Sequence, residues 1–191
     1  SDVGQPSGGR LDLRPLRTPA PWVLALAFFC FSSQFFSVFT FLPTYLTHTL
    51  GISAATATRA CALVPLAIIP GNLLGGVLVH RGWRPSTLLV APALPLLVVL
   101  PAMLLPTHSP GVMYALLTLY GLLLGIIPTG IFTQAPLLAP TPAATGPILG
   151  LALTGQGLGI LVGPPLVGAL LERTGSWLWP VVLLGTALVG L

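Results

Sequence analysis

Six long apolar runs, separated by short links that contain polar residues, glycine and proline, form the main pattern of the sequence. A membrane-spanning helix needs about 20 mostly apolar residues. The runs are 22–46, 55–79, 87–105, 112–134, 147–171 and 177–191, and the last is several residues short of a full span. Short links make consecutive helices run antiparallel. The pattern therefore predicts an all-α, polytopic membrane protein with six transmembrane helices.

The composition supports the same class of protein. Hydrophobic residues make up 54% of the chain and charged residues 5%, whereas a soluble domain carries roughly a quarter charged residues. So few charges cannot cover a surface in water, so we expect the lipid bilayer to surround most of the chain. The 22 glycines and 21 prolines lie mostly inside the apolar runs, where membrane helices tolerate both residues.

The two ends of the chain differ from its middle. Residues 1–20 are polar and rich in glycine and proline, without the apolar stretch of a signal peptide. We expect them to form a flexible tail or linker on the cytoplasmic side. Because the chain begins at Ser1 and the last run stops at Leu191, we also expect it to be a fragment of a longer protein.

Arginine placement predicts the orientation. All seven basic residues are arginines, and they are too scattered for a nucleic-acid-binding face. With six spans, five of them fall on one side, namely Arg10, Arg14, Arg17, Arg81 and Arg84, which leaves Arg59 and Arg173 on the other. Because positive charge collects on the cytoplasmic side, we predict that both ends are cytoplasmic, in a plasma membrane and specifically a bacterial inner membrane.

Two predicted helices carry a narrow polar face. In the first helix four hydroxyl residues fall within about 60° of one another at 100° per residue, with Gln34 beside them. In the fourth helix small and polar residues repeat at similar spacing. The two sets are Ser33, Ser37, Thr40 and Thr44, and Tyr114, Thr118, Gly121, Gly125 and Thr129. Polar stripes favour the interior of a bundle or a wet cavity, although a hydroxyl can also bond to its own helix backbone.

The third and sixth helices are apolar on all sides, which favours positions facing lipid. Inner first and fourth helices with outer third and sixth helices indicate one three-helix pattern used twice. The fifth helix carries Gly155, Gly159 and Gly163 at a strict spacing of four, a ridge that allows another helix to approach closely. Pro164 follows directly, and we expect it to kink the helix.

No enzyme signature appears in the chain. Nucleotide-binding, zinc-protease, serine-hydrolase and Cys-x-x-Cys patterns are all missing from the sequence. The two cysteines lie inside apolar runs and the three histidines lie near links on alternating sides. We therefore predict a protein that is not an enzyme and that needs no cofactor or metal. Arg59, inside the second run, either extends to the interface or faces a cavity and meets an anionic substrate group.

Two stretches of sequence resemble the major facilitator superfamily of transporters. "GNLLGGVLVHRGWRP", from Gly71 to Pro85, is similar to the glycine-rich helix end and basic turn of that family, with Gly75, Arg81, Gly82 and Arg84 in the pattern. "GQGLGILVGPPLVGALLERTGSW", from Gly155 to Trp177, looks like the Gly-x-x-x-Gly-Pro segment of family helices five and eleven. His80 stands where the family often has an acid. The cyanate and nitroimidazole transporter branch has a similar "ERTGSW" turn.

The resemblance implies the architecture and the partners. The chain would supply helices seven to twelve, half of a twelve-helix transporter, and the Arg-rich tail would be the central linker. A missing N-terminal half, or a second copy of the chain, would complete a cavity that opens alternately to each side. The glycine ridge of the fifth helix would pack against that missing half. Residues expected to contact a small-molecule substrate are Gln34, Ser37, Thr40, Arg59, Tyr120 and Gln156.

Two functions remain open on this reading. The first is secondary active transport of a small solute. The second is a structural or assembly protein, a bundle of six helices without a path for solute.

Overall fold

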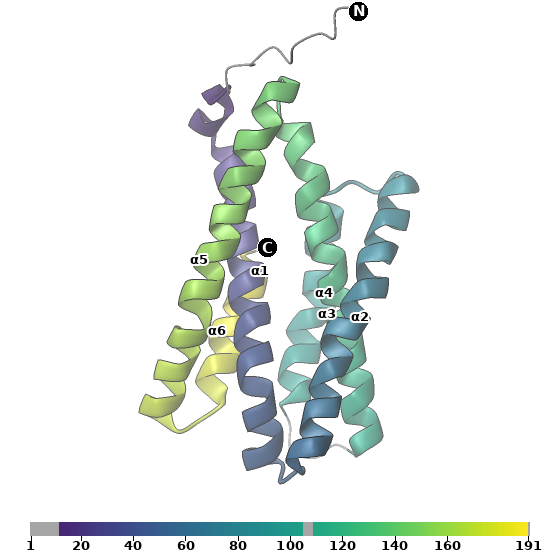
Figure 1. The fold of residues 1–191 in the computed structure, drawn as a ribbon, viewed down its shortest axis with the longest axis vertical. Coiled ribbons are helices and arrows are strands. Elements are labelled where there is room, and N and C mark those ends of the chain that lie inside the picture. Colours follow the sequence, from purple (N-terminus) through teal and green to yellow (C-terminus); the bar gives the residue numbers. More distant parts are fainter. Residues whose placement is uncertain (1–11, 105–108, 191) are drawn as a thin grey trace, which may run out of the picture.

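The computed structural model describes residues 12–104 and 109–190, and this part of the chain is helical (Figure 1). A 3₁₀ turn, η1 (Arg14–Arg17), precedes the first helix, and a π-helical turn, η2 (Tyr45–Thr49), extends it. The α-helices are α1 (Pro19–Thr44), α2 (Ala54–His80), α3 (Thr87–Met103), α4 (Pro110–Leu138), α5 (Pro142–Thr174) and α6 (Leu178–Val189). The predicted end of the third helix at Leu105, most of the tail with Arg10, and Leu191 lie outside the described residues.

Four of these helices are long and apolar enough to cross a membrane. They are α1 with its η2 extension, α2, α4 and α5, whereas α3 and α6 are apolar but shorter. The described residues therefore fit a polytopic membrane protein, and six complete spans stay a prediction. The link between the fourth and fifth helices is shorter than the expected residues 135–146, because α4 runs to Leu138 and α5 begins at Pro142. Proline stands in the first turn of α5, where no backbone N–H is needed.

The helices pack as two close pairs. The most extensive contacts join α1 to α5 and α2 to α4, which form the left and right sides of Figure 1. Helix α3 packs on α4, and α6 contacts α1, α3 and α5. Helices α1 and α4 meet along the middle of the molecule. The most apolar stretch of each long helix is buried to a different extent: 56% for α1 with η2 and 50% for α4, but 22% for α2 and 28% for α5. These values are consistent with inner positions for α1 and α4.

Glycine makes the α1·α5 contact possible. An added Cβ at Gly155 would meet the carbonyl oxygen of Ala25, and one at Gly159 would meet that of Phe29. At Gly163 it would lie 2.7 Å from the Cα of Ser33. The two backbones therefore touch directly along this seam. The expectation that this ridge packs against a missing half is wrong, because α1 of the same chain already covers it.

The α2·α4 contact follows the same principle. An added Cβ at Gly71 would meet the backbone of α4 at Leu122, and one at Gly125 would meet the carbonyl oxygen of Ile68 on α2. At Gly75 it would lie 2.9 Å from the hydroxyl oxygen of Thr129. Of the two alternatives for the small face of the fourth helix, a bundle interior or a wet cavity, the bundle interior holds over this stretch. The glycines of this face pack against α2, because a helix face without side chains lets the neighbouring backbone approach closely.

We predict opposite effects for alanine at two nearby glycines of α5. Gly159→Ala would force α1 and α5 apart and lower the free energy of unfolding by about 1–3 kcal/mol. Gly157→Ala is the matched control, because a Cβ there meets nothing within 4 Å and alanine favours a helix by up to about 1 kcal/mol. Thermal unfolding of the detergent-purified protein measures both. Equal unfolding temperatures for the two variants would contradict a backbone-to-backbone seam.

Candidate functional site

A ladder of phenylalanine rings follows the line where α1 faces α4. Residues 28, 31, 35 and 39 are spaced three or four apart, so their side chains fall on one side of α1. Ring centroids lie 6.0 Å apart between Phe28 and Phe31, 6.2 Å between Phe31 and Phe35, and 5.8 Å between Phe35 and Phe39. Phe132 of α4 meets Phe28 edge-on at 5.7 Å. We call these five residues the phenylalanine ladder.

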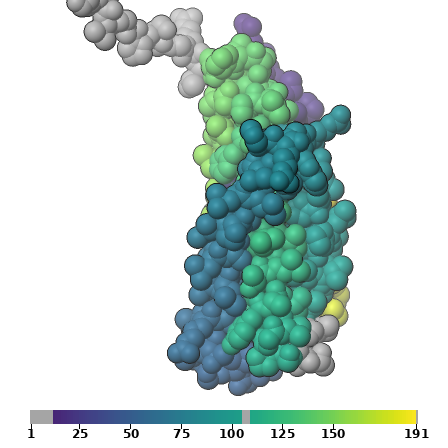
Figure 2. All heavy atoms as spheres, turned by 90° about the vertical axis from the view of Figure 1, so that its right-hand side faces the viewer, coloured from purple at the N-terminus to yellow at the C-terminus, as the bar shows by residue number. Residues whose placement is uncertain are grey.

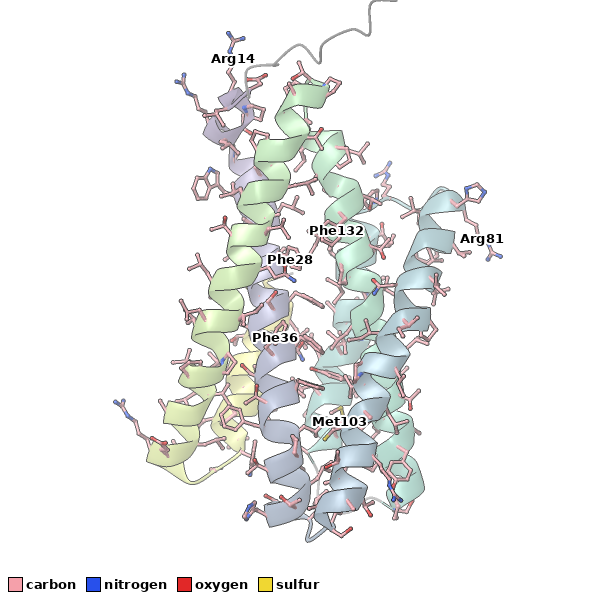
Figure 3. All side chains as sticks on the ribbon, viewed as in Figure 1. Arg14, Phe28, Phe36, Arg81, Met103 and Phe132 are labelled. Atoms are coloured by element: carbon pink, nitrogen blue, oxygen red, sulfur yellow. The ribbon has the colours of Figure 1, made fainter. Side chains whose placement is uncertain are left out.

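The ladder is partly open to the outside. Phe28 and Phe31 are buried, but Phe39 is 40% exposed and Phe132 is 45% exposed. In Figure 3, Phe28 and Phe132 lie between the α1·α5 pair and the α2·α4 pair, and Phe36 lies on the α1·α5 side. Phe36 contacts Phe35 edge-on at 4.9 Å. The ladder offers aromatic surface, which binds apolar and planar groups by dispersion and stacking.

Two of the predicted substrate residues bond to each other. The side-chain Nε2 of Gln34 donates a hydrogen bond to the hydroxyl oxygen of Tyr120 over 2.7 Å, and both side chains are fully buried. The bond joins α1 to α4. Among the described residues the Oε1 atom of Gln34 has no partner. In this conformation the pair braces the two central helices and has no surface to offer a solute.

The hydroxyl stripe of the first helix does not face one cavity. Ser33 is buried and donates to the carbonyl oxygen of Gly159 over 3.3 Å. Ser37 is buried beside α5 and α6, where its Oγ has no hydrogen-bond partner among the described residues. Thr40 and Thr44, on the same side but farther along α1, are exposed. The first half of the stripe therefore lies in the interior of the bundle, and the second half is open to the surroundings.

The remaining polar candidates lie on the flanking helices. Arg59 is exposed near the start of α2. It lies five residues before Val64, which contacts α4, so it projects roughly 140° away from that contact. Gln156 is half-buried on α5, next to Gly155 of the seam. The structure does not bring these two residues together with Gln34 and Tyr120.

The basic turn after α2 has a defined shape. Gly82 has a positive φ of 86°, and the N–H of Trp83 donates to the carbonyl oxygen of Leu78 over 3.1 Å. This is a glycine-terminated helix end, in which bonds reach back over the last turn. Arg81 and Arg84 are both exposed, and Figure 3 shows Arg81 at the upper end of α2, below the level of Arg14. Pro164 lies within α5, which continues through it to Thr174.

Comparison with known proteins shows the family. The family model of the Major Facilitator Superfamily matches residues 24–191. The chain belongs to the major facilitator superfamily. The family resemblance is thereby confirmed, and with it a role in membrane transport rather than in enzyme catalysis, at the level of the family. The cyanate and nitroimidazole branch stays a prediction.

Two relatives match a shorter part of this superfamily member. One is "Solute carrier organic anion transporter family member 2B1" of Rattus norvegicus, 40% identical over 74 residues. The protein of the same name from Mus musculus is 39% identical over 74 residues. Each match covers 38% of this chain and 11% of the relative. The matched stretch is thus little more than a tenth of either relative.

We predict that loss of the Tyr120 hydroxyl destabilises the fold. Tyr120→Phe would leave the buried Gln34 amide without its acceptor and cost about 0.5–2 kcal/mol, the range for hydrogen bonds between membrane helices and for buried groups left unpaired. Tyr114→Phe is the control, because Tyr114 is 37% exposed. Thermal unfolding of Gln34→Leu, Tyr120→Phe and the double variant gives the interaction free energy between the two side chains. Strictly additive losses would show that the bond contributes nothing.

Proposed function

We propose that this chain is the C-terminal half of a secondary active transporter that moves a small organic solute by alternating access. The observation that carries the proposal is the phenylalanine ladder. It lies where the two central helices meet, on the face that α1, α2, α4 and α5 share, and its outer rings are exposed. In superfamily transporters of this kind the substrate site lies between the two halves, near the middle of the bilayer.

The pairing of helices supports two three-helix repeats. If α1 is matched with α4, α2 with α5 and α3 with α6, the α1·α5 pair becomes the α4·α2 pair, the other close pair of the structure. Each pair is also joined through glycine faces. Helices α3 and α6 then occupy equivalent outer positions. A second six-helix half, or a second copy of this chain, would cover the face that bears the ladder.

The ends of the bundle support the proposed orientation. Arg14 and Arg81 both lie in the upper part of Figure 3, Arg81 at the upper end of α2, and Arg84 follows in the same turn as Arg81. Arg173 is in the last turn of α5, which begins at that end and runs to the opposite one. We propose that the end with Arg14 and Arg81 is cytoplasmic, in a bacterial inner membrane.

The chemistry of the face that carries the ladder bears on the class of solute. The described carboxylates are Asp12, ahead of η1, and Glu172, in the last turn of α5, so neither lies in the middle of a helix. Phenylalanine rings offer an apolar surface, and their faces also attract cations, so the ladder alone does not set the charge of the solute. The names of the two relatives make an amphipathic organic anion the first class to test. Thr40, Arg59 and Gln156 are the polar candidates that are not fully buried.

We predict that shortening an outer ring of the ladder slows transport. In proteoliposomes containing the full-length protein, Phe39→Ala would lower the flux of an amphipathic organic anion by about tenfold, because a lost stacking contact costs roughly 1 kcal/mol or more. Phe29→Ala is the matched control. Its ring lines a groove toward α5 and not the ladder, so its flux should stay near that of the unaltered protein.

Two results separate transport from a structural role. Correct insertion with no flux above empty liposomes, for anionic, neutral and cationic solutes alike, would favour the structural or assembly function. Equal loss of flux in Phe29→Ala and Phe39→Ala would remove the ladder as the contact surface while leaving transport itself in place.

A further inference from the structure

A groove lies on the face formed by α2, α3 and α4, away from the phenylalanine ladder. Its volume is about 190 Å³. Figure 2 shows this side of the molecule, with α4 visible between α2 and α3. The lining is apolar except for one threonine, and consists of Leu78, Trp83, Thr87, Leu88, Ala91, Pro92, Leu123 and Ile126.

The packing of α4 creates the groove. Helix α2 lies against one side of α4 through its glycine seam, with Gly71 and Gly125 in contact. Helix α3 lies against another side, where an added Cβ on Gly130 would be 3.1 Å from the Cβ of Leu88. Helices α2 and α3 make few contacts with each other. The space between them therefore has α4 as its floor and stays open toward the surroundings.

Two exposed arginines lie in the turn that carries Trp83 of this groove. Arg81 and Arg84 flank Trp83, which itself lines the groove and is 46% exposed. Gly82, with its positive φ, turns the chain so that these residues follow directly on the end of α2. Within the described part of the chain neither guanidinium has a carboxylate partner, and Asp12 is held elsewhere by Thr141.

The apolar part of the groove runs inward from these charges. Leu78 lies one turn of α2 before Arg81. On α3 the lining extends from Thr87 to Pro92, which at 1.5 Å per residue is about 8 Å along the helix. A tryptophan at the rim fits the interfacial region of a bilayer, where indole rings collect. The site thus combines a cationic rim, an interfacial aromatic residue and an apolar channel in the order that a phospholipid presents phosphate, glycerol and acyl chain.

We propose that this groove binds one anionic phospholipid, with its phosphate between Arg81 and Arg84 and an acyl chain against α4. Arginine suits the phosphate because its planar guanidinium donates two parallel hydrogen bonds and stays charged. Basic pockets between membrane helices bind anionic head groups in this way. The proposal concerns the lipid side of the bundle and does not depend on the identity of the transported solute.

The test compares lipids that differ only in charge. Native mass spectrometry of the detergent-purified full-length protein would show retained phosphatidylglycerol at concentrations where phosphatidylcholine with the same acyl chains is not retained. The double variant Arg81→Gln/Arg84→Gln would weaken phosphatidylglycerol binding roughly 30-fold, at about fivefold for each arginine. Arg173→Gln, an arginine of another helix end, is the charge control and should leave binding unchanged.

A second variant tests the apolar part without altering charge. Ala91→Trp would fill the groove and reduce retention of phosphatidylglycerol, whereas Ala62→Trp, at an exposed position of α2 outside the groove, would not. The unfolding temperature without added lipid confirms that each variant is folded. Equal retention of phosphatidylcholine, equal loss in Arg173→Gln or Ala62→Trp, or equal competition by soluble glycerol phosphate would each overturn the proposal.

Discussion

Direct contact between helix backbones is the constraint on which the rest of this structure depends. In lipid, apolar side chains gain nothing by leaving their surroundings, so helices associate through close packing and through polar contacts between them. Here Gly155, Gly159 and Gly163 bring α5 onto the backbone of α1, and Gly71 and Gly125 do the same for α2 and α4. The other two helices pack on these pairs, α3 on α4 and α6 on α1 and α5.

Close pairing determines which surfaces are left for function. The glycine faces are buried between helices of the same chain. The hydroxyl of Ser33 is buried with them and bonds to the α5 backbone. Beside these seams, α1 and α4 carry the phenylalanine ladder, which is partly exposed at Phe39 and Phe132. Pairing also leaves α2 and α3 with few contacts to each other, and the groove that Trp83 lines opens between them over α4. One packing rule thus produces both a face toward the proposed partner half and a face toward lipid.

In the low-dielectric interior, polar side chains on the inner helices bond to each other. Gln34 and Tyr120 are polar groups on inner helices, which made them candidates for contact with solute. In the structure each is fully buried and they bond to one another, because an unpaired polar group in such surroundings costs more than one that finds a partner. Their pairing joins α1 to α4, the two helices that also carry the phenylalanine ladder.

The sequence by itself determined the class of protein, the family and most helix positions. Runs of about 20 apolar residues have no stable alternative to a helix in lipid, and Gly82 and Gly175 mark helix ends with the positive φ they need. The ladder was also visible in principle, since seven of the eight phenylalanines lie between 28 and 41, four of them at helical spacing. Only the tertiary structure decided what each face touches. A glycine stripe or a row of hydroxyls specifies close approach or a polar neighbour without specifying which helix supplies it. That choice depends on the positions of all six helices at once, which is why α1 covers the ridge of α5 that had been expected to meet another half.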